Sequence, residues 1–315
     1  MKILVTGGAG FIGSNLVGTL LKDEKISLVR VFDNYSTGFK KNIAAYFDHP
    51  KFEMQEGDIR DYEACLKACT DIDVVSHQAA MGSVPRSIKD PITTNEINIS
   101  GTLNVFAAAK EKGIKKVVYA ASSSTYGDDK NLPKTEERIG RPLSPYAITK
   151  LVNELYAQVF HDLYDMNFIG LRYFNVFGPK QDPNGAYAAV IPLFMKAALE
   201  DSQPKINGDG SYSRDFTYVQ NAVQANIKAI NSDEKANNQI YNIAFGQSTT
   251  LNELWAFIQE VSSCSNPAIH GPNRAGDIPH SLAAISRAQE FLGYQPEYDV
   301  KQGLLEAFEW YKENL

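Results

Sequence analysis

The chain has 315 residues, of which 43% are hydrophobic and 22% are charged, enough for one large core with a smaller lobe attached. Its formal net charge of −6 argues against a nucleic-acid-binding protein, because binding to a phosphate backbone requires clustered Lys and Arg. The three cysteines, Cys65, Cys69 and Cys264, are too few for a disulfide framework or a four-ligand zinc site, so we expect no bound metal.

The first half of the sequence alternates short β-branched runs with longer amphipathic stretches, which is typical of βαβ units. The predicted strands are residues 2–6, 27–32, 51–55, 74–77, 117–120 and 168–173, and the predicted helices are 11–22, 61–68, 94–112 and 145–164. Right-handed crossovers place such helices on both faces of a parallel sheet, so the predicted fold is α/β, a doubly wound parallel sheet of the Rossmann type. The sequence opens on a strand pattern instead of a signal peptide and has no apolar run of membrane-spanning length, which favours a cytoplasmic protein that binds no membrane.

The pattern changes after Tyr173, where Gly, Pro and Asn become frequent and the predicted elements become short. We expect this part to form a smaller lobe that lies over the carboxyl ends of the strands and is interleaved with the sheet. A predicted helix at 219–230 and a predicted strand at 239–243 are expected to return to the main sheet. The expected division is a dinucleotide-binding domain of residues 1–175, joined by 219–245, and a second lobe of residues 176–218 and 246–315.

A glycine-rich turn joins the first predicted strand to the first predicted helix. Glycine lets backbone N–H groups approach a pyrophosphate, and the positive end of the helix dipole favours that anion. The residues expected to contact it are Gly7, Gly10, Phe11, Ile12 and Gly13.

Asp33 closes the next predicted strand, at the distance expected of the acidic residue in a dinucleotide-binding unit. Its carboxylate is placed to accept hydrogen bonds from the adenosine ribose and would repel the 2′-phosphate of NADP, so NAD is the predicted cofactor. The polar loop expected beside this ribose contains Asn34, Ser36, Thr37 and Gly38.

Tyr146 and Lys150 lie four residues apart near the start of a predicted helix, so their side chains share one face. A nearby ammonium, together with a positively charged nicotinamide, stabilises a phenolate and lowers the pKa of a phenol from its ordinary value of about 10. Tyr146 is therefore a candidate general base near neutral pH. A serine at the end of the preceding strand can hydrogen-bond the same substrate hydroxyl, and the run Ser122-Ser123-Ser124 leaves open which serine does so.

The chain resembles the extended short-chain dehydrogenases/reductases, and specifically the UDP-hexose 4-epimerases, over essentially its whole length. The motifs that carry this resemblance are T-G-G-A-G-F-I-G, D-N-Y-S-T-G, G-D-I-R-D, H-Q-A-A, S-S-S-T-Y-G, S-P-Y-A-I-T-K and L-R-Y-F-N-V-F-G. Two further segments, M-G-S-V-P-R-S-I-K-D-P and Q-D-P-N-G-A-Y-A-A-V-I-P, are similar to the substrate loops of the branch that acts on UDP-N-acetylglucosamine or its uronate.

The resemblance implies a role for each part of the catalytic constellation. Tyr146 is the implied base, Lys150 also holds the nicotinamide ribose, and either Ser122 or Ser123 is the serine partner. The residues implied along the nicotinamide half of the cofactor are Gln78, Ala79, Ala80 and Tyr173.

Three positions keep two interpretations each. Asp58 and Ile59 follow the third predicted strand and contact adenine in one interpretation, whereas in the other Asp58 caps the next helix. Asn98 supports the strands in the role that the resemblance implies. In the other interpretation, which fits the sequence equally well, it is simply a buried amide of a helix.

The resemblance also implies a sugar-nucleotide site beyond the carboxyl ends of the strands. Its expected residues are Ser83, Val84, Arg86, Asn175, Ala189, Val190, Asn207, Arg214, Arg274, Asp277 and Ser281, together with Ser122 and Ser123. Arg214 and Arg274 resemble the two diphosphate-binding arginines of the family, a role that suits a bidentate guanidinium, and Asn207 would lie near the uracil. Ser281 stands where epimerases restricted to UDP-glucose and UDP-galactose carry a tyrosine, so Ser281 and the small Ala189 leave room for an N-acetyl group.

The implied function is that of a UDP-N-acetylglucosamine 4-epimerase, which converts UDP-GlcNAc to UDP-GalNAc through a 4-keto sugar with tightly bound NAD. The sequence leaves open a uronate or a plain hexose as the substrate. It also leaves open two other functions. One is a sugar-nucleotide dehydratase, although that family resembles the motif T-D-E at the strand end where this chain has serines. The other is a non-catalytic NAD-binding scaffold. The helices at 94–112 and 145–164 resemble the pair through which the family forms homodimers, although core packing explains them almost as well.

Overall fold

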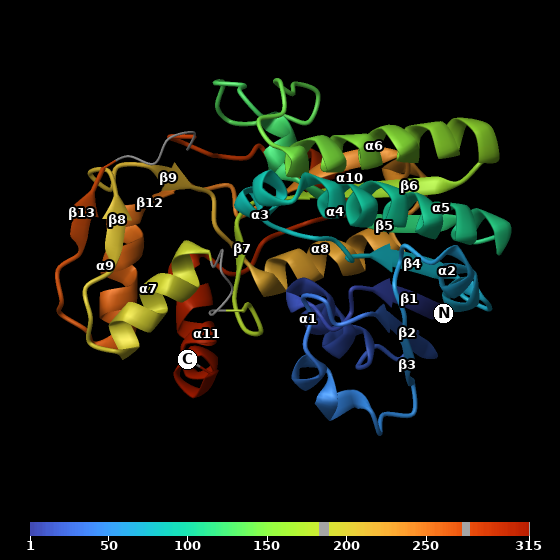
Figure 1. Ribbon diagram of the computed structural model, residues 1–315, viewed down its shortest axis with the longest axis horizontal. Helices are drawn as coiled ribbons and strands as arrows, with labels where there is room; N and C mark the ends of the chain where they lie inside the picture. Colours follow the sequence, from blue (N-terminus) through green and yellow to red (C-terminus); the bar gives the residue numbers. More distant parts are fainter. Residues whose placement is uncertain (183–188, 273–277, 315) are drawn as a thin grey trace.

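The computed structural model describes residues 1–182, 189–272 and 278–314. A seven-stranded parallel sheet forms the larger part of the molecule, with the strand order β11-β6-β5-β4-β1-β2-β3 (Figure 1). Its strands are β1 (Lys2–Thr6), β2 (Leu28–Asp33), β3 (Phe52–Glu56), β4 (Val74–His77), β5 (Lys116–Ser122), β6 (Asn167–Tyr173) and β11 (Gln239–Ile243). The predicted doubly wound parallel sheet is therefore confirmed.

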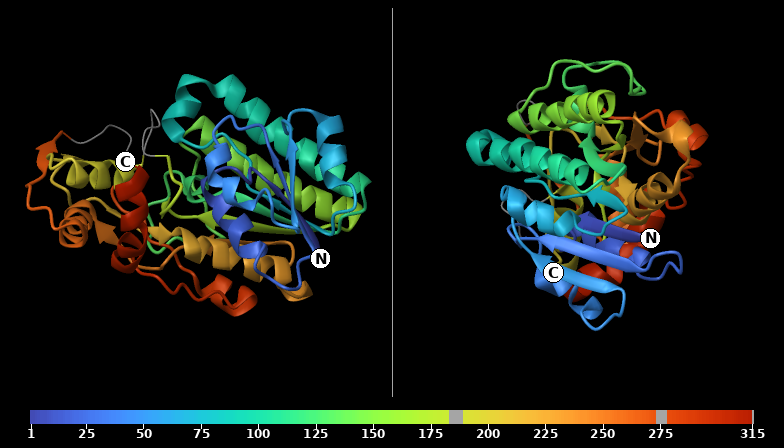
Figure 2. Two further views of the ribbon diagram at one scale, coloured as in Figure 1. Left: turned by 90° about the horizontal axis from the view of Figure 1, so that it is seen from below. Right: turned by 90° about the vertical axis from the view of Figure 1, so that its right-hand side faces the viewer.

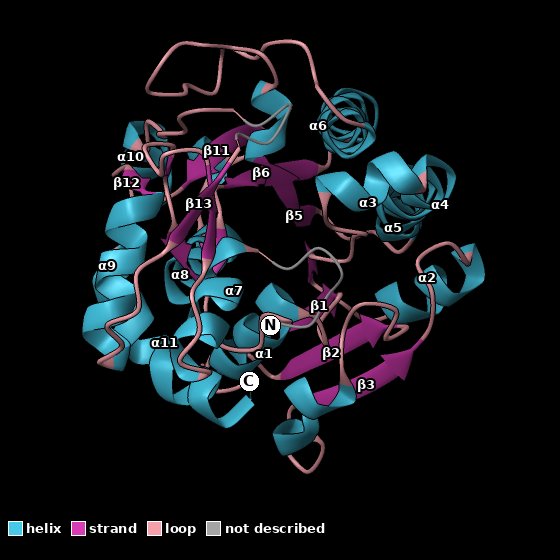
Figure 3. Cartoon of the chain, turned by 60° about the vertical axis from the view of Figure 1, so that its left-hand side comes forward, coloured by secondary structure: helices cyan, strands magenta, loops and turns pink. Residues whose placement is uncertain are grey.

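Helices cover both faces of this sheet, as Figure 3 shows. On one face lie α1 (Phe11–Leu20), α8 (Val219–Asn231) and α10 (Ser286–Leu292), and on the other lie α2 (Tyr62–Cys69), α5 (Thr102–Glu111) and α6 (Pro145–Tyr164). Each face has its own buried core, with Leu16 and Tyr241 in the first and Phe106 and Phe168 in the second. Central strands such as β4 are buried along their whole length, which explains why their sequences are continuous apolar runs.

The smaller lobe contains short strands and three helices packed around a third core that includes Phe194, Trp255 and Leu304. Its elements are β7 (Val176–Phe177), α7 (Val190–Leu199), β8 (Lys205–Asn207), β9 (Ser213–Arg214), β10 (Thr217–Tyr218), β12 (Thr249–Thr250), α9 (Leu251–Ser262), β13 (Ile269–Gly271) and α11 (Val300–Asn314). Its strands pair as β7 with β10, β8 with β13 and β9 with β12. The views of Figure 2 place this lobe beside the main sheet, with α8 running between the two.

The segment predicted as one helix at 94–112 is divided into three parts. It consists of α4 (Pro91–Asn95), a π-helical turn (Glu96–Gly101) and α5. The π-helical turn carries the fully buried Asn98, whose Oδ1 accepts a hydrogen bond from the Met81 N–H at 2.7 Å and whose Nδ2 donates to the Met81 carbonyl at 3.2 Å. A π-helical turn adds one residue to the helix, and here that turn carries the amide that holds the chain segment after β4.

The remaining short elements lie in connections between these parts. They are η1 (Lys40–Asn42), η2 (Ala44–Tyr46), α3 (Val84–Lys89), η4 (Ser123–Tyr126) and η5 (Glu234–Ala236). Within the three described ranges, no helix combines the length and apolar character needed to cross a bilayer.

Candidate active site

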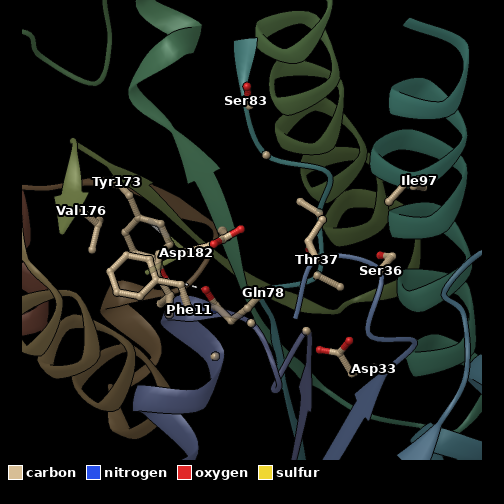
Figure 4. A pocket seen from close by; sticks show the side chains of 18 of the residues that line it. Phe11, Asp33, Ser36, Thr37, Gln78, Ser83, Ile97, Tyr173, Val176 and Asp182 are labelled. Carbon is tan, nitrogen blue, oxygen red and sulfur yellow. Dashed lines mark hydrogen bonds between the residues drawn. The ribbon is translucent and has the colours of Figure 1, made fainter. Parts of the chain in front are cut away.

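A pocket of about 630 Å³ lies where the strands of the main sheet end. Its lining includes the last residue of β2, β5 and β6, which are Asp33, Ser122 and Tyr173, and residues that directly follow β1, β3 and β4. Because all these strands are parallel, their carboxyl ends meet at one edge of the sheet. Figure 4 shows Asp33 and Thr37 on one side of this pocket and Tyr173 with Val176 on the other.

Most residues predicted to bind the cofactor line this pocket. They are Gly7, Gly10, Phe11, Ile12, Gly13, Asp33, Asn34, Ser36, Thr37, Asp58, Ile59, Gln78, Ala79, Ala80, Tyr146, Lys150 and Tyr173. Gly38 and Asn98 do not line it but support its wall: a Cβ on Gly38 would lie 2.7 Å from the Ala9 carbonyl carbon, and Asn98 holds Met81.

The glycine turn leaves the first turn of α1 open to the pocket. Gly10 is the N-cap of α1 and makes no side-chain capping hydrogen bond, so the N–H groups at the helix start are available to a ligand. Gly7 has a φ of 69°, and a Cβ there would lie 2.6 Å from the Ala79 nitrogen. A side chain at this position would fill the space between the turn and the segment after β4.

Asp33 joins the glycine turn to the end of β2. Its Oδ2 accepts a hydrogen bond from the Ala9 N–H at 2.9 Å, and its Oδ1 accepts one from the Tyr35 N–H at 2.8 Å. Burial raises the pKa of Asp33 above its ordinary value, while these backbone hydrogen bonds act in the opposite direction. The carboxyl group is thus held rigidly at the pocket edge where an adenosine ribose was expected.

Asp58 does not cap the helix that follows it. The N-cap of α2 is Asp61, whose side chain accepts a hydrogen bond from the Ala64 N–H. Asp58 instead binds Arg60, with Nη2 2.7 Å from Oδ2, and accepts a hydrogen bond from Asn34 Nδ2 at 2.8 Å. The hydrogen bond from Arg60 is the main cause that lowers the pKa of Asp58 to about 2, so a carboxylate lines this end of the pocket.

The start of α6 fixes the position of Tyr146. Ser144 caps the helix by accepting a hydrogen bond from the Ala147 N–H at 3.1 Å, and Pro145 occupies the first turn, a combination typical of helix starts. The Tyr146 N–H donates to Ser87 Oγ at 3.1 Å, which ties α6 to α3. Tyr146 and Lys150 both line the pocket, as their spacing predicts.

Ser122, rather than Ser123, faces this tyrosine. Ser122 ends β5, lines the pocket and hydrogen-bonds the phenol of Tyr146. Its Oγ also accepts hydrogen bonds from the N–H and the hydroxyl of Ser124, at 3.2 Å and 2.9 Å. Ser123 begins the η4 turn and is not part of the pocket lining.

Burial dominates the acid–base properties of the pair. It raises the pKa of Tyr146, which the hydrogen bond with Ser122 opposes, and it lowers the pKa of Lys150 to about 8, which the charge of Glu154 opposes. Lys150 Nζ donates to the Ala120 carbonyl at 2.7 Å and lies 6.0 Å from the centroid of the Tyr146 ring. Lys150 is not among the causes of the Tyr146 pKa shift, so these side chains alone do not lower the pKa of the phenol. The expectation that the ammonium lowers it together with a nicotinamide stays a prediction.

Tyr173 is held by two side-chain amides, those of the half-buried Gln78 and the buried Asn226. Its hydroxyl donates to Gln78 Oε1 at 3.1 Å and accepts a hydrogen bond from Asn226 Nδ2 at 2.7 Å, and Gln78 Nε2 donates to Asn226 Oδ1 at 3.0 Å. The close-up in Figure 4 shows Tyr173 and Gln78 meeting beside Phe11 and Asp182. These contacts fix the pocket wall where the nicotinamide half was expected.

Only some of the residues predicted to bind the sugar nucleotide line this pocket. Those that line the pocket are Ser83, Arg86, Ser122, Asn175 and Ala189, whereas Val84, Ser123, Val190, Asn207, Arg214 and Ser281 lie outside its lining. Arg274 and Asp277 fall outside the described residues. Ser83 and Asn175 have φ values of 101° and 35°, a strained geometry that often occurs at functional sites.

Arg214 and Ser281 lie close together although they are far apart in sequence. The Ser281 N–H donates to the carbonyl of Ser213 at 3.1 Å, and Arg214 Nη1 donates to the carbonyl of Pro279 at 3.1 Å. The two predicted residues thus belong to one patch of the smaller lobe, formed by β9 and the chain after residue 278.

Sequence reasoning missed the segment that closes the pocket after β7. Lys180, Gln181 and Asp182 line the pocket. Lys180 Nζ donates to the Asn42 carbonyl at 2.8 Å and lies 3.5 Å from the Ser14 carbonyl, so it connects this segment to α1 and to the loop after β2. The signal that could have revealed it is a lysine inside G-P-K-Q-D-P, directly beyond a strand that ends in the pocket.

Comparisons with known proteins identify related families and folds. The model of the NAD dependent epimerase/dehydratase family matches residues 3–244. The chain is 36% identical over 315 residues to a UDP-glucose 4-epimerase of Mycolicibacterium smegmatis, covering 99% of each chain. Among solved structures, it is similar to a UDP-N-acetylglucosamine 4-epimerase from Methanobrevibacter ruminantium in complex with UDP-N-acetylmuramic acid, with 40% identity, a TM-score of 0.94 and coverage of 100% and 99%. A UDP-glucuronic acid 4-epimerase from Bacillus cereus, in complex with UDP-glucuronic acid and NAD, matches with 30% identity, a TM-score of 0.92 and full coverage of both chains.

Proposed function

Because the chain belongs to the NAD-dependent epimerase/dehydratase family, we propose that it is a UDP-N-acetylglucosamine 4-epimerase, which interconverts UDP-GlcNAc and UDP-GalNAc. Membership confirms the resemblance drawn from the sequence, and NAD is the cofactor. The observation that carries the proposal is the meeting of Tyr146, Lys150 and Ser122 in the pocket that the glycine turn also lines. This arrangement joins a proton-transfer group to a dinucleotide site.

The residues present fit NAD. The uncapped first turn of α1 can bind the pyrophosphate. The carboxyl group of Asp33 can accept hydrogen bonds from the hydroxyls of the adenosine ribose. Lys150 is proposed to hold the nicotinamide ribose. When bound, NAD supplies a hydride acceptor for carbon 4 of the sugar and the positive charge of its nicotinamide ring.

In the proposed mechanism the side chains move one proton and hold the sugar. The phenolate oxygen of Tyr146 removes the proton of the 4-hydroxyl, and Ser122, which hydrogen-bonds that phenol, orients the hydroxyl. The charge of Lys150 favours the phenolate. After the keto sugar has turned over, Tyr146 returns the proton, so the protein ends the cycle in its initial protonation state.

We propose that the second lobe holds the sugar nucleotide. In this assignment Arg214 and Arg274 bind the diphosphate, and Asn207 lies near the uracil. The remaining contacts are assigned to Ser83, Val84, Arg86, Asn175, Ala189, Val190, Asp277 and Ser281. The division into residues 1–175 with 219–245, and 176–218 with 246–315, follows from the same proposal. The pairing of β11 with β6 supports it, whereas α10, within 246–315, packs on the main sheet.

The N-acetyl group is proposed from the size of two side chains. Ala189 lines the pocket, and Ser281 lies in the patch that also contains Arg214. Both are small, and a bulky side chain at Ser281 would narrow the space next to carbon 2 of the sugar. A uronate or a plain hexose is the alternative substrate, since the similar proteins include a UDP-glucose and a UDP-glucuronic acid 4-epimerase.

The test is to incubate the purified protein separately with UDP-GlcNAc, UDP-GlcNAcA and UDP-Glc, without added NAD, and to resolve the products by chromatography. We expect the highest kcat/KM for UDP-GlcNAc, with UDP-GalNAc as the product. Preferred turnover of UDP-GlcNAcA or UDP-Glc would refute the assigned substrate, and formation of a 4-keto-6-deoxy product would indicate a dehydratase. A Ser281→Tyr variant should lose activity on UDP-GlcNAc selectively, and an equal loss on UDP-Glc would contradict the steric argument.

The proposed function leads to two expectations, about the location of the protein in the cell and about its oligomeric state. Its substrate is a nucleotide sugar of the cytoplasm, so we propose a cytoplasmic location. We also propose a homodimer formed through α5 and α6, which gel filtration with light scattering would detect as twice the mass of 34.9 kDa.

A further inference from the structure

A buried ion pair lies one helical turn beyond Lys150. Glu154 on α6 and Arg172 on β6 form two hydrogen bonds, with Nε to Oε1 at 2.9 Å and Nη2 to Oε2 at 2.8 Å. The side chains are 4% and 3% exposed. A pair removed from water is costly to form and is weak evidence for stability, so its presence beside a reactive lysine requires another explanation.

Lys150 and Glu154 reach toward adjacent positions of two paired strands. They are four residues apart on α6, which places their Cβ atoms about 5–6 Å apart on one face. Lys150 Nζ binds the carbonyl of Ala120 on β5, and Glu154 binds Arg172 on β6, whose Cα partner in the sheet is Ala121. Glu154 therefore binds Arg172 directly and acts on Lys150, one helical turn away, through its charge.

The contacts of the pair are asymmetric. Arg172 also donates through Nη1 to the Tyr126 hydroxyl and to the Glu136 carbonyl, both at 3.1 Å. Both carboxylate oxygens of Glu154 have Arg172 as their partner among the described residues. Arg172 is thus anchored independently of Glu154, whereas the negative charge of Glu154 lies between two cations.

We propose that the Glu154–Arg172 pair controls the protonation of Lys150, which makes Glu154 and Arg172 positioning residues for the chemistry of Tyr146 and Lys150. This inference rests on the proposed function. Glu154 favours the ammonium form of Lys150, against the effect of burial. Arg172 limits that effect by neutralising part of the carboxylate charge.

Other charged or titratable groups face Lys150 from the elements around it. They are Tyr146 on its own helix and Tyr173 on β6, which line the same pocket, and His77 on β4, whose pKa the charge of Lys150 helps to lower; Tyr119 on β5 lies near Glu154 and Arg172 instead. His77 is neutral at neutral pH because burial lowers its pKa to about 3. Burial also raises the pKa of each of the three tyrosines. None of these four groups is negative near neutral pH, so removal of Glu154, whose charge raises the pKa of Lys150, should be visible in the titration of Lys150.

The test compares three variants of the NAD-loaded enzyme, Glu154→Gln, Arg172→Gln and the double variant. Lysine side chains are labelled with ¹³C at Cε, the Lys150 resonance is assigned through Lys150→Met, and its pKa is measured by NMR. We expect Glu154→Gln to lower that pKa by about one unit or more and Arg172→Gln to raise it. The double variant, which retains an amide pair without charge, should fall between Glu154→Gln and the wild type.

Opposite shifts are the decisive result, because a purely structural role would change both single variants in the same direction. Should a single variant fail to fold, the double variant still decides, since an unchanged pKa of Lys150 in it would overturn the inference. Asp162→Asn, which removes an exposed charge from the same helix, is the matched control and should leave the titration unchanged.

The pH dependence of the enzyme activity provides an independent measurement of the effect on Lys150. The alkaline limb of the pH profile of kcat/KM should shift in the same direction as the NMR titration. If no UDP-sugar is epimerised by the wild type, the proposed function fails, but the NMR comparison still tests the effect of the pair on Lys150. If epimerisation is normal and the titration does not respond, the inference about the pair fails alone.

Discussion

Replacement of Gly13 by alanine should weaken NAD binding, although alanine is the better helix former. In an open helix this change stabilises by about 1 kcal/mol. Here a Cβ on Gly13 would overlap the carbonyl oxygen of Gly7 and lie 2.9 Å from the Gly7 carbonyl carbon and the Gly8 Cα. All three are backbone atoms of the glycine turn, so no side chain can move aside. The turn itself must move away from α1.

The size of the effect follows from these two terms. Overpacking costs about 3 kcal/mol at the upper end of its usual range, which leaves a net loss of about 2 kcal/mol after the helix gain. Because the strain is relieved by displacing the turn that receives the pyrophosphate, the loss should appear in NAD affinity, as an increase of Kd by about 30-fold.

Two other glycines of the pocket provide a graded control. Gly10 would place a Cβ 3.1 Å from the Gly7 carbonyl oxygen, whereas a Cβ on Gly82 meets nothing within 4 Å. The assay measures the NAD content of the purified protein and the NAD Kd by calorimetry after the cofactor has been removed. We expect the loss to increase in the order Gly82→Ala, Gly10→Ala, Gly13→Ala. A Kd for Gly13→Ala within twofold of the wild type, or an equal loss in all three, would refute the reasoning.

Three further predictions address other parts of the site. Tyr146→Phe should retain NAD but lose at least about 10²-fold in kcat, measured by product chromatography; near-normal turnover would disprove the role of the phenol. Lys180→Met should release NAD faster than the wild type, because Lys180 joins the pocket wall to the Asn42 carbonyl. The control Lys205→Met, at an exposed position, should not, and equal release rates in the two variants would contradict the proposed role of Lys180. Burial lowers the pKa of His77 to about 3, below the unfolded value of about 6.5, so its contribution to stability is complete above pH 6.5 and is lost as the pH falls. One pH unit below 6.5 the loss of stability amounts to about 1.4 kcal/mol. The free energy of unfolding, measured with urea at pH 7.5 and 5.5, should therefore differ less between the two pH values for His77→Gln than for the wild type.

Local patterns predicted the main sheet well because its signals lie close together in the sequence. The bounds expected for β1, β4 and α6 agree with the structure, and α6 in particular begins at a Ser-Pro pair and ends at Asp165, which adopts the left-handed conformation. The π-helical turn at Asn98 escaped prediction. Within this turn Asn98 contacts Met81, a partner 17 residues away in the sequence, and apolar periodicity carries no information on such a contact.

In the site, too, prediction worked where the signal is local in the sequence and failed where it depends on distant partners. Asp33 and Ser122 were predicted from their place at the carboxyl ends of parallel strands, which meet at one edge of the sheet, and both line the pocket, whereas Gln78 followed from the family resemblance. Asp58 has a different partner from the one that helix-capping rules suggest, since Asp61 already caps α2. The pair of Glu154 and Arg172 joins a helix to a strand, and only the packing of α6 on the sheet brings it under the pocket.

The position of β11 has a consequence for how the chain reaches its native state. The chain leaves the main sheet at Tyr173 and returns to it only at Gln239, where β11 pairs with β6. Until that return is made, β6 exposes an unpaired edge, and unpaired edges are sites of aggregation. On the ribosome, the sheet cannot be completed before the first segment of the smaller lobe, residues 176–218, has been synthesised, so pairing across this long separation should be slow. A protease cut between the lobes would therefore leave neither fragment as a complete folding unit, and coexpressed fragments would have to assemble in order to fold.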